Sequence, residues 1–417
     1  MDTTAEPVRS SRAGRLGLLT ALYFVQGMPF GFQATALPVY LRSHGVSVTT
    51  IGFLGLLSLP WLLKVLWAPL VDRYGSRRFG RRKSWIVPLQ AALALTAAAA
   101  AFVSIERELS LLLALVFLFN LFAATQDIAV DGLAVDTLRP DELGLGNAAQ
   151  VVGYKLGMLT GGGLLVWASR AIGWSGLFLA MAALALCVML ITLLAREPTP
   201  TSEAASRGEI FDWRSFARQA RAALTLPGTG WLLLFIATYK LGEAMSDVLY
   251  KPFLVDAGIR PEQIGLWLGT WGMIASLLGS LAGGLLASRA PLLWALGVTA
   301  TLRIGPLLGR WWLAEFGVTP ERFAGVTLAE EFFGGALTTV VFALMMSKVD
   351  RKIGASHYTL LASVEVAGKM PAGPIGGLLV GAAHWSYAQV FLLGVVLSVA
   401  FLALIPAQRP HTIKSAT

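Results

Sequence analysis

The chain has 417 residues, of which 56% are hydrophobic and 14% charged, and its formal net charge is +9. This composition excludes a soluble globular protein, and the single cysteine excludes an intramolecular disulfide. Apolar stretches of about 20 residues recur along the chain instead, which is the length that a bilayer demands of a helix.

We predict an all-α membrane protein with twelve transmembrane helices. They fall at about 16–40, 49–71, 85–104, 110–134, 146–168, 173–195, 229–254, 262–287, 290–313, 325–346, 355–382 and 386–406. Most Lys and Arg residues lie on one alternating set of loops, so the positive-inside rule places both termini in the cytoplasm. This asymmetry explains the net charge without a nucleic-acid partner.

The first two predicted helices carry polar residues and a break. Gly27, Pro29 and Gly31 predict an interruption of the first helix. In the second helix, Lys64 either extends toward the basic loop that follows or faces a cavity. We expect one side of the first helix to contact substrate through Gln26, Phe30 and Gln33.

The loop after the second helix reads APLVDRYGSRRFGRRKSW. An acidic residue, then Arg and Gly, then a basic cluster resembles the cytoplasmic signature of the major facilitator superfamily. The resemblance implies a gating role for Asp72 and Arg73, because a carboxylate at a helix end can bind neighbouring helix termini in one state of a transporter.

The fourth predicted helix carries Asn120, Asp127 and Asp131 on one face, with Gln126 about 100° away. Two carboxylates one turn apart in a membrane repel each other, so one of them can carry a proton. Pairing with basic residues of neighbouring helices is the alternative, and it would keep both carboxylates ionised.

A repeat relates the two halves of the chain. Residues 152–166 read VGYKLGMLTGGGLLV and residues 366–380 read VAGKMPAGPIGGLLV, so Lys155 corresponds to Lys369 at an offset of 214 positions. Ile51 and Ile264 correspond one residue out of phase with this. Parallel repeats that each bury a lysine are typical of transporters whose substrate site lies between the repeats.

The repeat and a polar segment divide the chain into a six-helix bundle at 1–195, a cytoplasmic linker at 196–227 and a second six-helix bundle at 228–417. The linker sequence FDWRSFARQARAAL has apolar residues on one side and arginines on the other. This pattern predicts an amphipathic helix on the cytoplasmic surface of the lipid bilayer.

Helix seven carries a charged stripe of Lys240, Glu243, Asp247 and Lys251. Opposite charges at these spacings can neutralise each other, and we expect such a pair between Asp247 and Lys251. Lys240 and Glu243 lie nearer mid-membrane, where an ion pair is costly and often functional.

Three other groups of residues are expected to have structural roles. Arg303, Glu330 and Glu331 belong to helices nine and ten, which in this fold lie at the edge of the cavity. The glycine runs 161–163 and 376–377 are expected to permit close helix packing.

No nucleotide-binding, metal-binding or nucleophile motif is present, so we predict a transporter without cofactor or metal rather than an enzyme.

Several phrases resemble the family of AmpG muropeptide permeases and acetyl-CoA transporters. They are SLPWLLKVLWAPLVDR at 58–73, TQDIAVDGLAVD at 125–136 and LGLGNAAQVVGYKLG at 143–157. The phrases MPFGFQATALPVYLRSHGVS, YKLGEAMSDVLYKPFLVDAGI and EQIGLWLG resemble a subgroup, the RhtX/FptX-type siderophore permeases and the vertebrate major facilitator superfamily domain-containing protein 3. The resemblance implies the major facilitator fold.

These observations favour a monomeric, proton-coupled symporter of the bacterial inner membrane that imports a small amphipathic anion or zwitterion, such as a siderophore. Anhydromuropeptide, acetyl-CoA and drug export are the alternatives. The expected proton carriers are Asp127, Asp131, Glu243 and Glu365. The expected substrate contacts are Gln26, Phe30, Gln33, Gln126, Tyr154, Lys155, Tyr239, Lys240, Trp267, Trp271, Tyr358 and Lys369. Alternatively, the lysines only balance the carboxylates.

Overall fold

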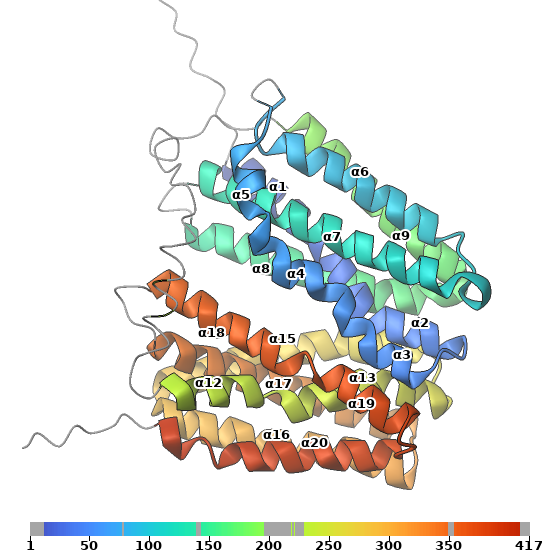
Figure 1. The fold of residues 1–417 in the computed structure, drawn as a ribbon, viewed down its shortest axis with the longest axis vertical. Helices are drawn as coiled ribbons and strands as arrows, with labels where there is room; N and C mark the ends of the chain where they lie inside the picture. The colour runs from blue at the N-terminus through green and yellow to red at the C-terminus, as the bar shows by residue number, and fades with distance from the viewer. Residues whose placement is uncertain are drawn as a thin grey trace, which may run out of the picture. The chain divides into compact units, whose positions relative to one another are not determined.

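The computed structural model describes residues 12–76, 79–138, 143–195, 229–348 and 354–408, together with residues 218 and 221. Its regular elements are helices (Figure 1). The chain divides into two compact units, residues 1–37 with 57–211 and residues 38–56 with 212–417. The linker predicted at 196–227 lies outside the described residues apart from positions 218 and 221.

Among the described residues, the first unit contains seven α-helices, two of them short, with irregular turns between them. Its long elements are α1 (Arg12–Gly31), α6 (Lys83–Ala100), α7 (Ile105–Thr137), α8 (Leu143–Leu159) and α9 (Leu165–Leu194). The second predicted span is broken into short pieces, of which α4 (Leu59–Leu63), the 3-10 turn η3 (Lys64–Leu66) and α5 (Ala68–Arg73) lie in this unit. Two π-helical turns, η1 (Phe32–Ala36) and η5 (Thr160–Leu164), extend α1 and α8.

Helices α1 and α8 approach closely because glycines line their contact. A Cβ atom added to Gly27 would lie 2.0 Å from the carbonyl oxygen of Tyr154, and one added to Gly157 would lie 2.0 Å from that of Phe24. Gly161 and Gly162 face the backbone of Met28 and Gly31 in the same way. The predicted packing role of this glycine run is confirmed.

The second unit contains most of the remaining helices. They are α3 (Val48–Gly52), α12 (Thr229–Thr238), α13 (Leu241–Asp256), α14 (Pro261–Ile264), α15 (Gly272–Arg289), α16 (Leu292–Phe316), α17 (Pro320–Ser347), α18 (Gly354–Lys369), α19 (Ala372–Gly381) and α20 (Tyr387–Leu402). The π-helical turn η6 (Gly265–Trp271) joins α14 to α15. Helix α2 (Leu37–Ser43) and the 3-10 stretch η2 (Phe53–Ser58) cross the boundary between the two units.

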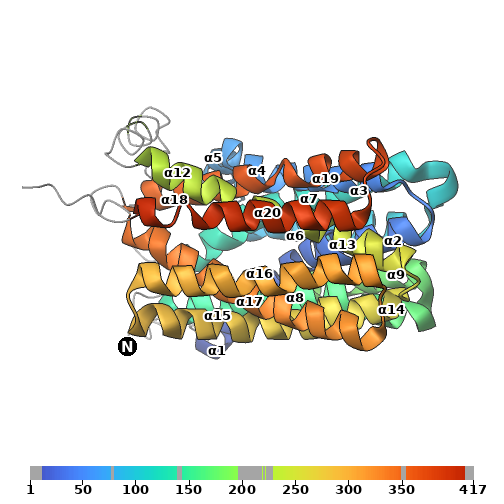
Figure 2. The ribbon, with the colours of Figure 1, turned by 90° about the horizontal axis from the view of Figure 1, so that it is seen from below.

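Within the second unit, α16 packs against α17 and α20, and α17 packs against α15 (Figure 2). A core of buried apolar side chains, including Phe235, Leu296 and Val340, holds α12, α16 and α17 together. Gly377 of α19 lies against Gly52 of α3, where an added Cβ would be 2.9 Å from the Gly52 Cα atom. This confirms the packing role predicted for the second glycine run.

Helical segments occupy all twelve predicted spans. Among the described residues, six helical stretches are by themselves long and apolar enough to cross a membrane. One of them, Ala149–Leu194, is 46 residues long and holds two predicted spans, which Gly173 separates with a backbone φ of 70°. The break predicted in the first helix appears as the π-helical turn directly after Gly31.

Candidate substrate and proton sites

Polar side chains line the contact between α1 and α7 in the first unit. The Tyr23 hydroxyl donates a hydrogen bond of 2.7 Å to the Asp131 carboxylate, and the Asn120 amide donates one of 2.6 Å to Gln33. Gln33 in turn donates to the Ser58 hydroxyl at 2.7 Å. Asn120 and Gln33 therefore have partners within the protein, and the Asp131 carboxylate accepts a hydrogen bond from Tyr23.

Asp127 binds the ammonium of Lys64 on η3. The Asp127 side chain is 9% exposed to solvent and the Lys64 side chain 30%. Lys64 therefore points at helix α7 rather than at the basic loop, which decides between the two orientations that the sequence left open. Because Asp127 is buried, separating the two charges while both stay ionised would leave a buried carboxylate without its partner, which is costly.

Gln26 and Gln126 are fully buried, yet neither carboxamide has a hydrogen-bond partner among the described residues. Gln26 of α1 lies in the sequence between Tyr23 of α1 and Gln33 of η1, which donate to and accept from residues of α7. A buried amide without a partner costs about 1–3 kcal/mol. The two carboxamides therefore keep hydrogen-bonding capacity that no described residue uses.

Lys155 of α8 is half-buried and forms no ion pair with the described carboxylates. Its neighbour Tyr154 stacks at a tilt on Phe30, with ring centroids 6.0 Å apart, and meets Trp61 edge-on at 6.4 Å. Among its described residues, the first unit therefore combines a lysine without an ion pair, two carboxamides without a hydrogen-bond partner, and aromatic rings. Such a combination suits an amphipathic anion.

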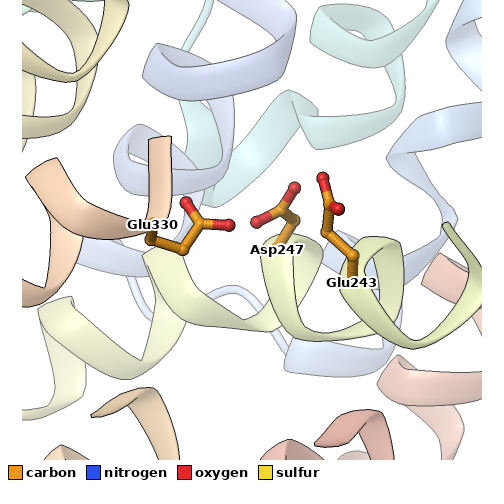
Figure 3. A group of neighbouring side chains, drawn as sticks. All are labelled: Glu243, Asp247 and Glu330. Atoms are coloured by element: carbon orange, nitrogen blue, oxygen red, sulfur yellow. The ribbon is translucent and has the colours of Figure 1, made fainter. Parts of the chain in front are cut away.

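Three carboxylates and two arginines form a buried network in the second unit. Figure 3 shows Glu243 and Asp247 of α13 beside Glu330 of α17. Arg310 of α16 binds Asp247 at 2.6 Å and Glu330 at 2.7 Å. Arg303 binds the Glu330 carboxylate and carbonyl, and reaches Glu243 at 3.2 Å.

Each of these three residues offers a carboxylate oxygen within 4.8 Å of the others, a spacing that a metal ion could use. The two guanidinium groups already bind these oxygens, however, and would repel a metal cation. The residues of the network therefore fit arginine and proton chemistry better than metal ligation.

The predicted pairing of Asp247 with Lys251 is wrong. The Lys251 ammonium donates to the backbone carbonyl of Asp247, whereas the carboxylate of Asp247 binds Arg310. Lys240 forms no ion pair with a described carboxylate and lies 5.8 Å from the ring centroid of Tyr239. Arg303 and Arg310 of α16 bind these carboxylates instead of the two lysines, because each guanidinium group can reach two carboxylates at once.

Helix α18 holds a second charged group of the same unit. Glu365 accepts two hydrogen bonds from Lys369, at 3.0 and 2.9 Å, and one of 3.2 Å from the Tyr239 hydroxyl. Lys369 is thus paired, whereas its repeat partner Lys155 is not. Of the two tryptophans among the predicted substrate contacts, Trp267 is half-buried and Trp271 is 47% exposed.

The predicted gating residues lie on α5, but the side chains of Asp72, Arg73 and also Tyr358 are outside the described set. The basic loop nevertheless has a described anchor. Arg82 donates to the Asp136 carboxylate at 2.9 Å, and Arg81 lies 3.0 Å from the same oxygen. Asp136 is the last residue of the phrase TQDIAVDGLAVD, but the sequence does not indicate which residues pair with it.

Comparison with known proteins places the chain in a family. The anhydromuropeptide permease of Escherichia coli strain K12 is 31% identical over 97% of this chain and 82% of its own length. The chain belongs to the AmpG and acetyl-CoA transporter family of the major facilitator superfamily. The family model described as acetyl-coenzyme A transporter 1 matches residues 15–169. A putative AmpG 4 transporter of Rickettsia conorii is 26% identical over 94% of this chain and 96% of its own length.

Solved structures agree on the fold of this AmpG-family chain. A bacterial homologue of the human lysosomal transporter Spinster has a TM-score of 0.71 at 17% identity and covers 96% of the chain and 98% of its own. The nucleoside transporter NupG has a TM-score of 0.69 at 14% identity, with coverages of 94% and 98%. The predicted superfamily and fold class are confirmed, and the protein is a multi-pass membrane transporter rather than an enzyme.

The sequence indicates the buried charged residues better than it indicates the side chains that they bind. It predicts structural roles for Arg303 and Glu330, and Arg310 is not among the predicted residues. A signal was present, because two arginines seven residues apart on an apolar helix share one face and require buried anions. The sequence could not show which carboxylates supply them.

Proposed function

We propose that the protein is a proton-coupled importer of an amide-rich, anionic solute of the anhydromuropeptide class, working by alternating access in the bacterial inner membrane. The proposal rests on one observation in the first unit. Lys155, Gln26 and Gln126 are polar groups within the protein that have no described partner.

The chemistry of these groups selects the solute. A carboxamide donates and accepts hydrogen bonds at once, so it pairs with the amide groups of a peptide or an acetamido sugar. An ammonium binds a carboxylate. Phe30, Tyr154 and Trp61 add apolar ring surface for the less polar part of the same molecule. The resemblance to the E. coli anhydromuropeptide permease supports the same class.

Proton coupling is the second part of the proposal. Asp127, Asp131, Glu243 and Glu365 remain the predicted carriers, and all four are wholly or largely buried. Three of them touch a basic side chain and Asp131 touches Tyr23. Each carboxylate could therefore exchange its present partner for a proton when the surroundings change.

Transport by the purified protein in lipid vesicles tests this function. Labelled anhydromuropeptide, ferri-siderophore and acetyl-CoA are offered separately, with and without an imposed pH gradient and a protonophore. We expect accumulation of anhydromuropeptide that the protonophore abolishes. Accumulation of the ferri-siderophore alone would instead support the siderophore prediction, and no pH effect on any solute would exclude proton coupling.

The same proposal includes a monomeric protein with both termini in the cytoplasm and the loop at 74–83 on the cytoplasmic side. The distribution of Lys and Arg in the sequence supports this orientation.

A further inference from the structure

Lys64 lies beside the aromatic rings of the first unit. Its ammonium binds the Asp127 carboxylate and lies 5.6 Å from the ring centroid of Trp61. Trp61 meets Tyr154 edge-on, and Tyr154 packs at a tilt on Phe30. The lysine and the three rings are partly exposed, whereas Asp127 is buried. Lys64 therefore borders the ring surface to which we assign the solute, while its charge is held by a carboxylate of the protein.

The backbone around Lys64 is fastened to α7 independently of this ion pair. The Trp61 indole donates a hydrogen bond of 3.0 Å to the Asn120 side chain, and the Trp67 indole donates one of 3.1 Å to the Thr125 hydroxyl. The two bonds lie on either side of Lys64 in the sequence. Because a lysine side chain has a flexible stem of methylene groups, its ammonium can change partner while the turn η3 stays in place.

The other groups around Asp127 cannot replace this lysine. The described titratable groups that act on Asp127 are Lys64 of η3, Asp131 of the same helix, Tyr23 of α1 and Tyr154 of α8. Asp131 is a second carboxylate, on which Lys64 also acts, and Lys155 forms no ion pair with either. The arginines at positions 81 and 82 bind Asp136 instead. One ammonium therefore faces two carboxylates, and Asp127 cannot lose it without another positive charge in its place.

An anion bound at the rings changes this balance. A solute carboxylate beside Trp61 competes with Asp127 for the Lys64 ammonium. If the ammonium moved while Asp127 stayed ionised, a buried carboxylate would lose its partner next to a second one. A proton on Asp127 removes this cost, because a neutral carboxyl group needs no cation. Binding of the anion and binding of the proton then favour each other, which is the linkage that symport requires.

We propose that Lys64 is a second anion-binding residue, which binds Asp127 in the absence of solute and the carboxylate of the solute when Asp127 is protonated. The proton comes from water and forms an O–H bond on Asp127, and the Lys64 ammonium keeps its own protons. This inference rests on the proposed proton-coupled function and assigns the coupling in the first unit to one pair of residues.

Protons counted during binding test the proposal in detergent, without transport. The purified protein, in weak buffer with a pH indicator, is mixed with anhydromuropeptide. We expect uptake of about one proton per bound anion in the wild type, and an affinity that falls as the pH rises. Asp127→Asn should take up no proton, and its affinity should not depend on pH in the same range, because Lys64 is then always available to the anion.

Two lysine variants separate proton coupling from anion binding alone. Lys64→Met should weaken binding about 10- to 100-fold and abolish proton uptake, because Asp127 without a cation already holds a proton before the anion arrives. The matched variant Lys155→Met should also weaken binding, but it should leave the number of protons per bound anion unchanged.

Three results would overturn the proposal. They are proton uptake that persists in Asp127→Asn, an unchanged affinity in Lys64→Met, and uptake that is lost in Asp131→Asn but kept in Asp127→Asn. If Asp127→Asn fails to fold, Lys64→Met decides alone, because its affinity and its proton uptake are both specified.

Ferri-siderophore and acetyl-CoA, offered in the same assay, separate this proposal from the proposed function. Binding of anhydromuropeptide without proton uptake would overturn the coupling by Lys64 and leave the substrate class in place. Proton-linked binding of one of the other two anions through Lys64 would do the reverse. Absence of binding by all three anions would overturn both.

Discussion

Lys155, like Lys240, is a predicted substrate residue that forms no ion pair with a described carboxylate. Its repeat partner Lys369 is neutralised within its own helix by Glu365, so the two equivalent lysines are in different electrostatic states. The two lysines are therefore equivalent in the sequence repeat but differ in their charged partners. Binding of an anion is expected to depend on Lys155 more than on Lys369.

We expect Lys155→Met to weaken binding of the transported anion about 10- to 100-fold, since a hydrogen bond to a charged group contributes about 1.5–3 kcal/mol. Lys369→Met should have a smaller effect on affinity. Equilibrium binding to protein in detergent measures both, with Arg170→Gln on the exposed face of α9 as the control. Equal affinities for the wild type and the double Lys155→Met, Lys369→Met variant would remove both lysines from the site.

Asp127 and Glu243 are expected to control accumulation. Asp127→Asn or Glu243→Gln should abolish uptake against a gradient while exchange of preloaded substrate continues, because exchange requires no net proton movement. Because Asp127→Asn leaves the ammonium of Lys64 unpaired, the double variant with Lys64→Gln provides a control for folding. Accumulation that persists in both single variants would show that these carboxylates do not carry the coupling proton.

At the residue scale, the sequence identified most buried polar groups but few of their partners. Asp127 stood out because a carboxylate in an apolar helix is costly wherever it lies. Its partner Lys64 is 63 positions away in another helix, and nothing local in either segment links the two. Local spacing even misled at Asp247, where a lysine one turn away was a poorer partner than an arginine of α16.

At the scale of elements, the glycines of α8 set how closely it approaches α1. We expect Gly157→Ala to lower the apparent Tm of the purified protein, because its Cβ would overlap the Phe24 carbonyl and such overpacking costs about 1–3 kcal/mol. Gly17→Ala is the control within α1, since nothing lies within 4 Å of its added Cβ. Thermal unfolding in detergent measures both, and equal Tm values would show that the two helices can separate freely.

Two element boundaries follow glycines that interrupt an apolar stretch of the sequence. Gly31 precedes a π-helical turn and Gly173 turns the chain between two spans. The second span departed furthest from expectation, because one predicted helix is a series of short α and 3-10 pieces. The apolar composition of this segment predicts the length of the span, but it does not predict whether the backbone forms one continuous helix.

At the scale of the whole molecule, the membrane orientation can be tested with the chain's own cysteine content. Cys187 is the single cysteine, so Cys187→Ser provides a background for introduced thiols. We expect Ser76→Cys to be labelled by a membrane-impermeant maleimide only in inverted vesicles, and Ser104→Cys only in intact cells. The opposite pattern would reverse the orientation deduced from the positive charges.

The repeat, the composition and the family phrases were sufficient for the superfamily and for the helical class. Residues 38–56 group with the second unit, although they precede most of the first unit in the sequence. Membership of a unit depends on contacts between distant segments, such as the bidentate pair of Arg42 with Asp256. Hydropathy and repeat spacing carry no information about such contacts.

The π-helical turn η6 bears on the history of the repeat. The two halves correspond at an offset of 213 near Ile51 and Ile264 but at 214 near Lys155 and Lys369, so the second half contains one additional residue between these points. Directly after Ile264 the second half has a π-helical turn, where the first half has the tighter 3-10 stretch Phe53–Ser58. A π-helical turn accommodates one more residue than an α-helical turn without forming a loop. One residue inserted after Ile264 is thus accommodated inside the helix, and the later residues of the second half, including Lys369, keep the helix faces of their counterparts in the first half.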